Sequence, residues 1–248
     1  MNGMWTIFRR ELAGLFLTPL AWVVLCLALL VQGGFFLLYL DGYDGDVNGA
    51  LSLALGEGIG FWMLLAILPP LLTMRMISEE ARSGVLEFLL TAPLPDWAVI
   101  VGKTLAATAF MVLLWSSNIV YALVLQGAGG SPDWGQVAGG LMGACLVSGL
   151  FCSVGIVTSA VCSTPLLAAF LGVVLNVAMV VFPITGNLMP GPWRTWFDRL
   201  VQPFDLPAHL HTSFSQGAFD SADLVFFLVW ISVALFTATR LVEARRWR

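Results

Sequence analysis

Charged side chains are scarce in this sequence. They make up 10 % of its 248 residues, whereas soluble domains carry about 25 %. Hydrophobic residues make up 59 %, and the mean hydropathy is +0.91. This balance excludes an ordinary soluble domain. It predicts an all-α polytopic membrane protein, built as a single transmembrane domain over residues 1–248.

The sequence also lacks a basic patch interleaved with aromatic residues, and its net charge is −4. A nucleic-acid partner is therefore not expected. The four cysteines, at positions 26, 145, 152 and 162, lie in apolar segments without C-x-x-C spacing or a nearby histidine. We expect them to serve in packing rather than in metal binding.

Motifs of enzymes are missing or incomplete. Gly102-Lys103-Thr104 resembles the end of a phosphate-binding loop, but the glycine that the pattern requires five residues earlier is replaced by Trp97. We therefore expect no nucleotide, cofactor or metal in this chain and no enzymatic activity. Lys103 is instead expected to extend to the lipid headgroups.

One small group leaves an enzymatic alternative open. Asp205, His209 and His211 could form a metal or catalytic site of a membrane hydrolase, although histidines two apart share a face only in extended chain. The role of the two histidines is undecided from the sequence. Loss of a bound metal on replacing both histidines would favour this alternative.

Six apolar segments are long enough to cross a bilayer as helices: 19–40, 59–76, 97–125, 136–161, 166–182 and 222–239. Pro69-Pro70 is expected to kink or unwind the second. The fourth is rich in glycine, alanine and serine, which allow close helix packing. Asn118 and Asn176, inside the third and fifth, are each expected to bond to a neighbouring helix.

The segments between and before the spans differ in character. Residues 4–17 carry an apolar stripe and end at Thr18-Pro19, so they predict an interfacial helix lying on the membrane. Residues 41–58 are acidic and are expected to form an external loop. Residues 183–220 contain five prolines and are too broken to span, which predicts an external segment with a short amphipathic helix at 193–200.

Basic residues set the orientation. Nine of the eleven fall on the side of both termini: Arg9, Arg10, Arg75, Arg82, Lys103, Arg240, Arg245, Arg246 and Arg248. Only Arg194 and Arg199 fall on the other side. The positive-inside rule therefore predicts that both termini are cytoplasmic.

Residues 78–95 interrupt the apolar pattern on that side. Ser83 is expected to cap a short helix from Gly84 to Leu90, whose side chains are too few to span and too apolar for water. A partner protein would cover this helix, with the surrounding charges fixing its register. Lying in the headgroup region is the alternative that physical chemistry leaves open.

The string from Glu79 to Pro93, followed by Asp96-Trp97 and Gly102-Lys103, resembles the coupling-helix region of ABC-2-type transporter permeases. It is most similar to the gliding-motility-type and copper-enzyme-maturation-type subgroup. The stretch from Arg10-Glu11-Leu12 through Thr18-Pro19 resembles the interfacial elbow helix and first span of this family, which makes residues 4–17 the elbow helix. The closing stretch from Leu241 to Trp247 resembles the end of the same subgroup. Nearly the whole chain is covered in order.

This resemblance implies a half-transporter in a bacterial inner membrane. A second permease copy or paralogue would complete a dimer, and a separate subunit would bind and hydrolyse ATP with Mg²⁺. An external-domain accessory protein is a further possible partner, and residues 183–220 would be a re-entrant segment. The residues that would couple to the ATP-binding subunit are Glu79, Glu80, Arg82, Ser83, Gly84, Val85, Leu86, Glu87, Phe88, Leu89 and Leu90.

The function expected from these observations is a permease subunit that couples ATP hydrolysis in its partner to export or to force transmission. The alternative is a non-transporting membrane scaffold that uses the same segment to hold a soluble protein. No polar constellation lines an identifiable path, so the sequence does not name a cargo. The lack of a metal-ligand set weakens copper as a cargo.

Overall fold

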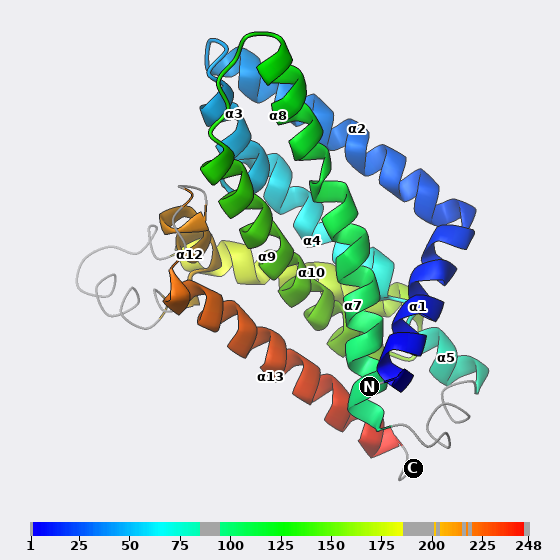
Figure 1. Cartoon of the computed structure of the whole chain (residues 1–248). Coiled ribbons are helices and arrows are strands. Elements are labelled where there is room, and N and C mark those ends of the chain that lie inside the picture. The colour runs from blue at the N-terminus through cyan, green and yellow to red at the C-terminus, as the bar shows by residue number, and fades with distance from the viewer. Residues whose placement is uncertain are drawn as a thin grey trace.

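The computed structural model describes residues 2–84, 95–185, 201, 204–214, 217 and 220–245, and in these ranges every regular element is a helix (Figure 1). The elements are α1 (Asn2–Leu17), α2 (Pro19–Gly42), α3 (Val47–Ser52), the π-helix η1 (Leu53–Glu57), α4 (Ile59–Thr73), α5 (Ser78–Ser83), α7 (Asp96–Trp115), α8 (Ser117–Gly127), α9 (Trp134–Val161), α10 (Pro165–Ile184), α12 (Leu206–Thr212) and α13 (Ser221–Arg245).

Six helical stretches are long and apolar enough to cross a membrane. They are Ala21–Gly42, Val47–Ser83, Asp96–Gly127, Trp134–Val161, Pro165–Ile184 and Ser221–Ala244. The second joins α3, η1, α4 and α5, and the third joins α7 and α8. The chain is therefore a multi-pass membrane protein, as its composition predicts.

The long helix α9 lies at the centre of the bundle, in contact with α4, α7, α10 and α13 (Figure 1). Its small residues make this possible. A Cβ added to Gly155 would lie 2.2 Å from the Thr73 hydroxyl oxygen, and one added to Gly140 would lie 2.8 Å from the Leu55 Cβ. The prediction that this span packs closely against other spans is confirmed.

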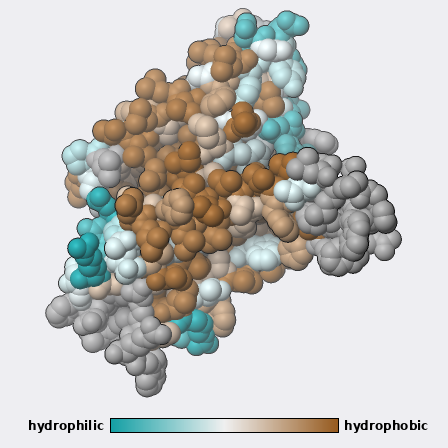
Figure 2. Space-filling view, turned by 180° about the vertical axis from the view of Figure 1, so that it is seen from behind, coloured by the Kyte–Doolittle hydropathy of each residue, from teal (hydrophilic) through white to brown (hydrophobic). Residues whose placement is uncertain are grey.

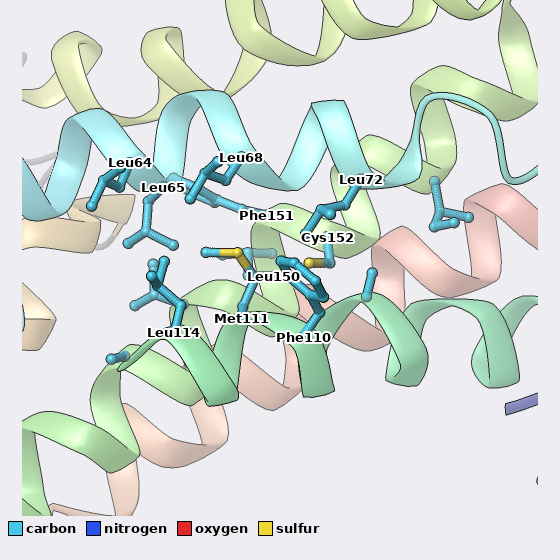
Figure 3. Packing of buried hydrophobic residues seen from close by; sticks show 14 of the residues in the cluster. Leu64, Leu65, Leu68, Leu72, Phe110, Met111, Leu114, Leu150, Phe151 and Cys152 are labelled. Atoms are coloured by element: carbon cyan, nitrogen blue, oxygen red, sulfur yellow. The ribbon is translucent and has the colours of Figure 1, made fainter. Parts of the chain in front are cut away.

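Three helices meet in the apolar core. Leu64, Leu65, Leu68 and Leu72 of α4 face Phe110, Met111 and Leu114 of α7 and Leu150, Phe151 and Cys152 of α9 (Figure 3). Cys152 is fully buried there, in the packing role expected for it, whereas Cys26 lies on the exposed side of α2. The core therefore depends on side-chain packing between helices.

The outside of the bundle is apolar as well. Leu30 of α2, Phe170 of α10 and Phe236 of α13 are each exposed by more than half of their surface. Figure 2 shows hydrophobic residues over the middle of one face and hydrophilic residues toward its margins. Lipid tails cover such a surface in a bilayer, which leaves α2, α10 and α13 at the periphery.

The expected external loop at residues 41–58 is instead largely helical. The Asp46 carboxylate accepts hydrogen bonds from the amides of Asn48 and Gly49 and so caps α3. Ala50 and Leu51 have no exposed surface, because α3 and η1 pack against α2 and α9. The loop prediction was wrong because its acidic residues lie at helix ends, while the apolar residues between them are buried.

Pro69 and Pro70 do not unwind their helix. Helix α4 continues through both residues and ends one turn later, at Thr73. The Thr73 hydroxyl donates to the Pro69 carbonyl at 2.8 Å, and the Met74 amide donates to the Pro70 carbonyl at 2.9 Å. The chain leaves the helix only at residues 74–77, which form a turn before α5.

Neither buried asparagine bonds to a neighbouring helix in the part of the chain that the structure describes. Asn118 donates to the Trp115 carbonyl of its own chain segment, and Asn176 has no hydrogen-bond partner among the described residues. Trp115 of α7 makes one of the polar contacts between helices, since its indole donates to Ser148 of α9 at 2.9 Å. Helix packing at Asn176 is therefore set by small neighbours such as Gly172, not by the amide.

Candidate functional site

Four charged side chains from three helices meet at the end of the bundle that carries α1 and α5 (Figure 1). They are Arg10 and Glu11 of α1, Glu80 of α5 and Lys103 of α7, and we call them the charged cluster. Helix α1 packs against α7. It comes so close at Gly102 that an added Cβ would lie 3.0 Å from the Met4 carbonyl oxygen. This close approach brings Lys103 to Glu11.

The ammonium group of Lys103 is the centre of the charged cluster. Its Nζ lies 3.0 Å from Glu11 Oε1 and 2.8 Å from Glu80 Oε1, and the side chain has no exposed surface. Arg10 Nη2 lies 2.5 Å from Glu11 Oε1 and 3.1 Å from Glu80 Oε1. Two positive and two negative groups thus balance one another.

Lys103 does not extend to the headgroups as predicted. A buried ammonium is stable only when oppositely charged groups replace its hydration, and two carboxylates do so here. Extension along the surface is the usual outcome only for a lysine without such partners. The prediction was wrong because Glu11 and Glu80 are distant from Lys103 in sequence.

The pKa values of the α1 groups reflect this setting. Burial disfavours the ionised Glu11 carboxylate, but the nearby charges and hydrogen bonds of Lys103 and Arg10 outweigh it, so its pKa is lowered below the usual value. Burial also disfavours the Arg10 cation, yet Glu11 and Glu80 raise its pKa further. Both shifts favour the charged forms of the two α1 side chains.

A second polar contact holds α5 in place. The Ser159 hydroxyl, near the end of α9, accepts hydrogen bonds from the amides of Ile77 and Ser78 at 3.2 and 3.1 Å. It lies 3.0 Å from the Met74 carbonyl, to which it donates. The turn between α4 and α5 would otherwise leave these backbone groups unpaired in a buried position.

Helix α5 ends where the sequence predicted a helix to begin. Ser83 lies in its last turn, and its hydroxyl donates back to the Glu80 carbonyl at 3.3 Å. Gly84 follows with φ 76°, the left-handed conformation that glycine adopts at helix C-termini. The assignment of Ser83 as an N-cap was therefore wrong, because Gly84 makes this position a C-terminal stop.

The predicted coupling residues fall into three groups. Glu79, Arg82 and Ser83 are exposed on α5, and Gly84 is half-buried beyond it. Glu80 points into the charged cluster. The rest of the set lies outside the described residues: Val85, Leu86, Glu87, Phe88, Leu89 and Leu90. The short amphipathic helix expected at 193–200 also lies outside them.

The structure separates the residues of the enzymatic alternative. Asp205 caps α12 by accepting from the Ala208 amide at 3.1 Å. His209 Nδ1 lies 2.6 Å from Asp223 Oδ1, and the other carboxylate oxygen of Asp223 accepts a hydrogen bond from the Ser213 hydroxyl. His211 pairs elsewhere, with its Nδ1 3.6 Å from Glu57 Oε1. Within the described part of the chain, no three His, Cys, Asp or Glu side chains form a metal-binding group.

Sequence reasoning missed both the pairing of Glu11 with Lys103 and the contacts of Ser159. A signal existed for the first. Ile7, Glu11 and Leu15 follow one another at helical spacing, and a carboxylate on an apolar stripe requires a buried partner. Ser159 gave no such signal, because it is one of many small residues in α9.

Comparison with known proteins agrees with this architecture. The family model described as "ABC-2 family transporter protein" matches residues 5–246. No curated protein matches the chain. Because the matched range covers nearly the whole sequence, including α1, the charged cluster and all six spans, the chain belongs to the ABC-2 transporter family.

Proposed function

We propose that this chain is the permease subunit of an ABC transporter whose spans are moved by ATP hydrolysis in a separate subunit. The family match supports a membrane transport component. We place the protein in a bacterial inner membrane with both termini in the cytoplasm, following the nine basic residues on that side. ATP and Mg²⁺ would bind to the partner subunit and not to this chain.

The observation that carries the proposal is the charged cluster. Residues 78–95 connect two spans, and Glu80 within them is paired to Lys103 at 2.8 Å. Arg10 and Glu11 extend the same contacts to α1. A force applied to α5 by a partner would therefore reach α1 and α7 together, which is the linkage that a coupling segment requires.

Within this segment we propose two roles. Glu79, Arg82 and Ser83 are exposed and supply polar contacts to the partner, while the apolar run Val85–Leu90 supplies the anchor. Glu80 is occupied by intramolecular ion pairs, so its role is to transmit movement. Gly84 allows the chain to turn between the two parts.

The finer assignments remain those that the sequence resemblance implies. They are membership of the gliding-motility-type and copper-enzyme-maturation-type subgroup, a dimer with a second permease copy or paralogue, and a re-entrant external segment at 183–220. An external-domain accessory protein would accompany this dimer. The transported substrate is left open.

The docking role is tested by substitutions in the apolar run 85–90, followed by measurement of binding and ATPase activity of the ATP-binding subunit. Glu87→Lys, or Leu86→Asp combined with Leu89→Asp, should abolish co-purification of the ATP-binding subunit and its permease-dependent ATPase activity. Asp41→Lys, at the C-terminal end of α2, is the charge-changing control and should leave both co-purification and ATPase activity intact. Unchanged values in the anchor variants would refute the docking role. A co-purifying partner without a phosphate-binding loop would instead favour a scaffold.

A further inference from the structure

A cavity of about 350 Å³ lies between α10, α12 and α13, at the end of the bundle away from the two chain termini (Figure 1). Its volume is in the range of small-molecule sites, about 300–1,000 Å³. Every residue in its lining is apolar, and four aromatic side chains contribute to it: Phe182, Phe204, Phe226 and Trp230. We call this cavity the aromatic pocket.

The lining of the aromatic pocket can be reached from outside the bundle. Phe182 and Phe204 expose 56 % and 53 % of their surface, and Phe226 and Trp230 are half-buried. Neither α10 nor α13 has to move for a small molecule to touch these rings. The pocket is therefore an open site in the structure as it stands.

The aromatic rings are steeply inclined to one another. Phe204 and Trp230 form a T-shaped pair with centroids 5.7 Å apart, and Phe226 and Trp230 form another with centroids 6.4 Å apart. Each ring carries negative partial charge on its two faces. Inclined rings around one cavity form an aromatic cage, the arrangement by which proteins recognise quaternary ammonium groups.

The lining offers no side-chain acceptor for a hydrogen bond from a ligand. The indole nitrogen of Trp230 is the only nitrogen or oxygen atom in its side chains, and it is a donor. A ligand with N–H or O–H groups would lose hydration here without compensation, which disfavours sugars, peptides and primary ammonium groups. A quaternary ammonium group has no N–H to satisfy and still interacts with the ring faces.

The charge around the aromatic pocket favours a cation over an uncharged ligand. Residues 201–239 contain three aspartates and no lysine or arginine. One of them, Asp205, directly follows the lining residue Phe204. Another, Asp223, pairs with His209, yet the three carboxylates outnumber the two histidines of this range even when both are protonated. Nearby carboxylates stabilise a bound cation, most of all where water is scarce.

We propose that the aromatic pocket binds a small organic cation of the quaternary ammonium class, with an apolar or aromatic body. The cationic group lies against the rings of Phe204 and Trp230, and the body lies against Met179 and Leu206. A lipid chain would match the walls in polarity but would not benefit from the ring faces or the negative charge. The inference does not depend on the proposed ATP-binding partner, because binding is a property of this chain alone.

The test uses the purified full-length chain in an uncharged detergent and a matched pair of photoactivatable probes. One probe is an aryl azide that carries a trimethylammonium group, and the other carries a tert-butyl group of the same shape without the charge. Relative to labelling of α2, the cation should label peptides with residues 179–183, 201–206 and 226–230 about tenfold more than the uncharged probe does. Equal labelling would show a plain apolar cavity and would overturn the proposal.

Competition distinguishes a small cation from a lipid headgroup that carries the same trimethylammonium group. Unlabelled benzyltrimethylammonium should displace the cationic probe from these peptides. Phosphatidylcholine added to the micelles should not displace it. Displacement by phosphatidylcholine alone would assign the pocket to a lipid headgroup and contradict the proposal.

Phe204→Leu separates the contribution of the ring from that of the cavity. Leucine keeps apolar surface but has no π-face, so the preference for the cation should fall severalfold while labelling by the uncharged probe is retained. Phe204 is half exposed, and the variant should elute from size-exclusion chromatography as the original protein does. Phe170→Leu makes the same change on the exposed side of α10, outside the pocket, and should keep the full preference. Full preference in Phe204→Leu would contradict the aromatic cage.

Asp205→Asn tests the charge. Asparagine caps a helix as well as aspartate does, so the cap of α12 at the Ala208 amide is preserved while the negative charge is lost. Labelling by the cation should fall about two- to threefold, and labelling by the uncharged probe should not change. Asp133→Asn, in the cap of α9, is the matched control and should leave both unchanged. Unchanged cation labelling in Asp205→Asn would overturn the charge complementarity on which the choice of a cation rests.

Discussion

At Lys103 a positive charge without exposed surface is held by carboxylates from two different helices. Such an arrangement is costly to assemble, because all the groups lose hydration, and costly to break, because any group left alone remains buried. The cluster therefore favours one relative position of α1, α5 and α7. It does so more through the penalty for alternative positions than through net attraction.

Lys103→Met tests this penalty. The variant leaves Glu11 and Glu80 facing each other without the ammonium, so the free energy of unfolding should fall by about 3 kcal/mol. Denaturation in detergent, followed by circular dichroism, measures the change. Arg240→Ala removes an exposed pair with Glu243 and should change it by less than about 1 kcal/mol. Equal losses of unfolding free energy in Lys103→Met and Arg240→Ala would contradict the conclusion that the charged cluster is costly to break.

The lowered pKa of Glu11 gives a pH dependence. A carboxyl group whose pKa is lower in the folded state stabilises that state above its unfolded pKa of 4.5, and this stabilisation is lost as the pH falls through the folded value. Glu11→Gln should therefore be less stable than the original protein at pH 7. The difference between the two should shrink below about pH 4.5. A difference that is constant from pH 7 to pH 3 would show that Glu11 carries no such linkage.

At the scale of the helix, α5 is too short to hold its own position. Six residues form fewer than two turns, so the placement of α5 depends on tertiary contacts. Ser159 binds the beginning of α5, and the charged cluster binds Glu80 in its middle. The helix ends at Ser83, and Gly84 follows it in the left-handed conformation. Motion of the following segment would act on α5 as a unit.

Ser159→Ala should weaken the attachment of the beginning of α5 to α9. The amides of Ile77 and Ser78 lose their acceptor, and a lost buried hydrogen bond of about 1 to 1.5 kcal/mol corresponds to about tenfold faster amide exchange. Hydrogen exchange with mass spectrometry over residues 74–84 measures it. Ser232→Ala, in α13, is the matched control, because its hydroxyl donates within its own helix, to the Leu228 carbonyl. Slow exchange retained at Ile77 and Ser78 would argue against a tether.

Several glycines of α9 allow neighbouring parts of the chain to approach its backbone closely. A Cβ on Gly139 would lie 2.5 Å from the Phe214 carbonyl oxygen, which is backbone and cannot rotate away. Gly139→Ala should therefore lower the free energy of unfolding by about 1–3 kcal/mol, although alanine favours helix. Gly34→Ala, which meets nothing within 4 Å, should raise it slightly. Denaturation in detergent, followed by circular dichroism, measures both changes, and stabilisation by Gly139→Ala would contradict the packing described.

At the scale of the whole molecule, the six spans could be predicted because each is a long apolar run, and length alone distinguishes them from loops. The helices α3 and η1 could not, because burial against α9 overrides the local glycines and acidic residues. The charged cluster escaped prediction for a similar reason. Arg10 and Glu11 are about 70 and 90 residues away from their partners Glu80 and Lys103, and the packing of α1 on α7 brings Glu11 to Lys103.

Asn176 shows the limit of composition-based reasoning within the spans. A polar residue in a membrane helix usually bonds across an interface, yet this side chain is fully buried and its two polar atoms have no partner among the described residues. Its neighbour Gly172 allows α10 to approach Pro70 of α4 closely. The contact between these helices is therefore made by shape rather than by hydrogen bonding.

Residues 78–95 are proposed to bind a separate ATP-binding subunit, and the rest of the proposed function depends on this contact. A photo-crosslinking amino acid at position 87, in native membranes, tests it most directly, with the same amino acid at Tyr43, at the far end of α2, as the control. We expect position 87 to crosslink to a protein whose peptides include a phosphate-binding loop, and position 43 not to. No crosslink at position 87, or one to a protein lacking such a loop, would contradict the account.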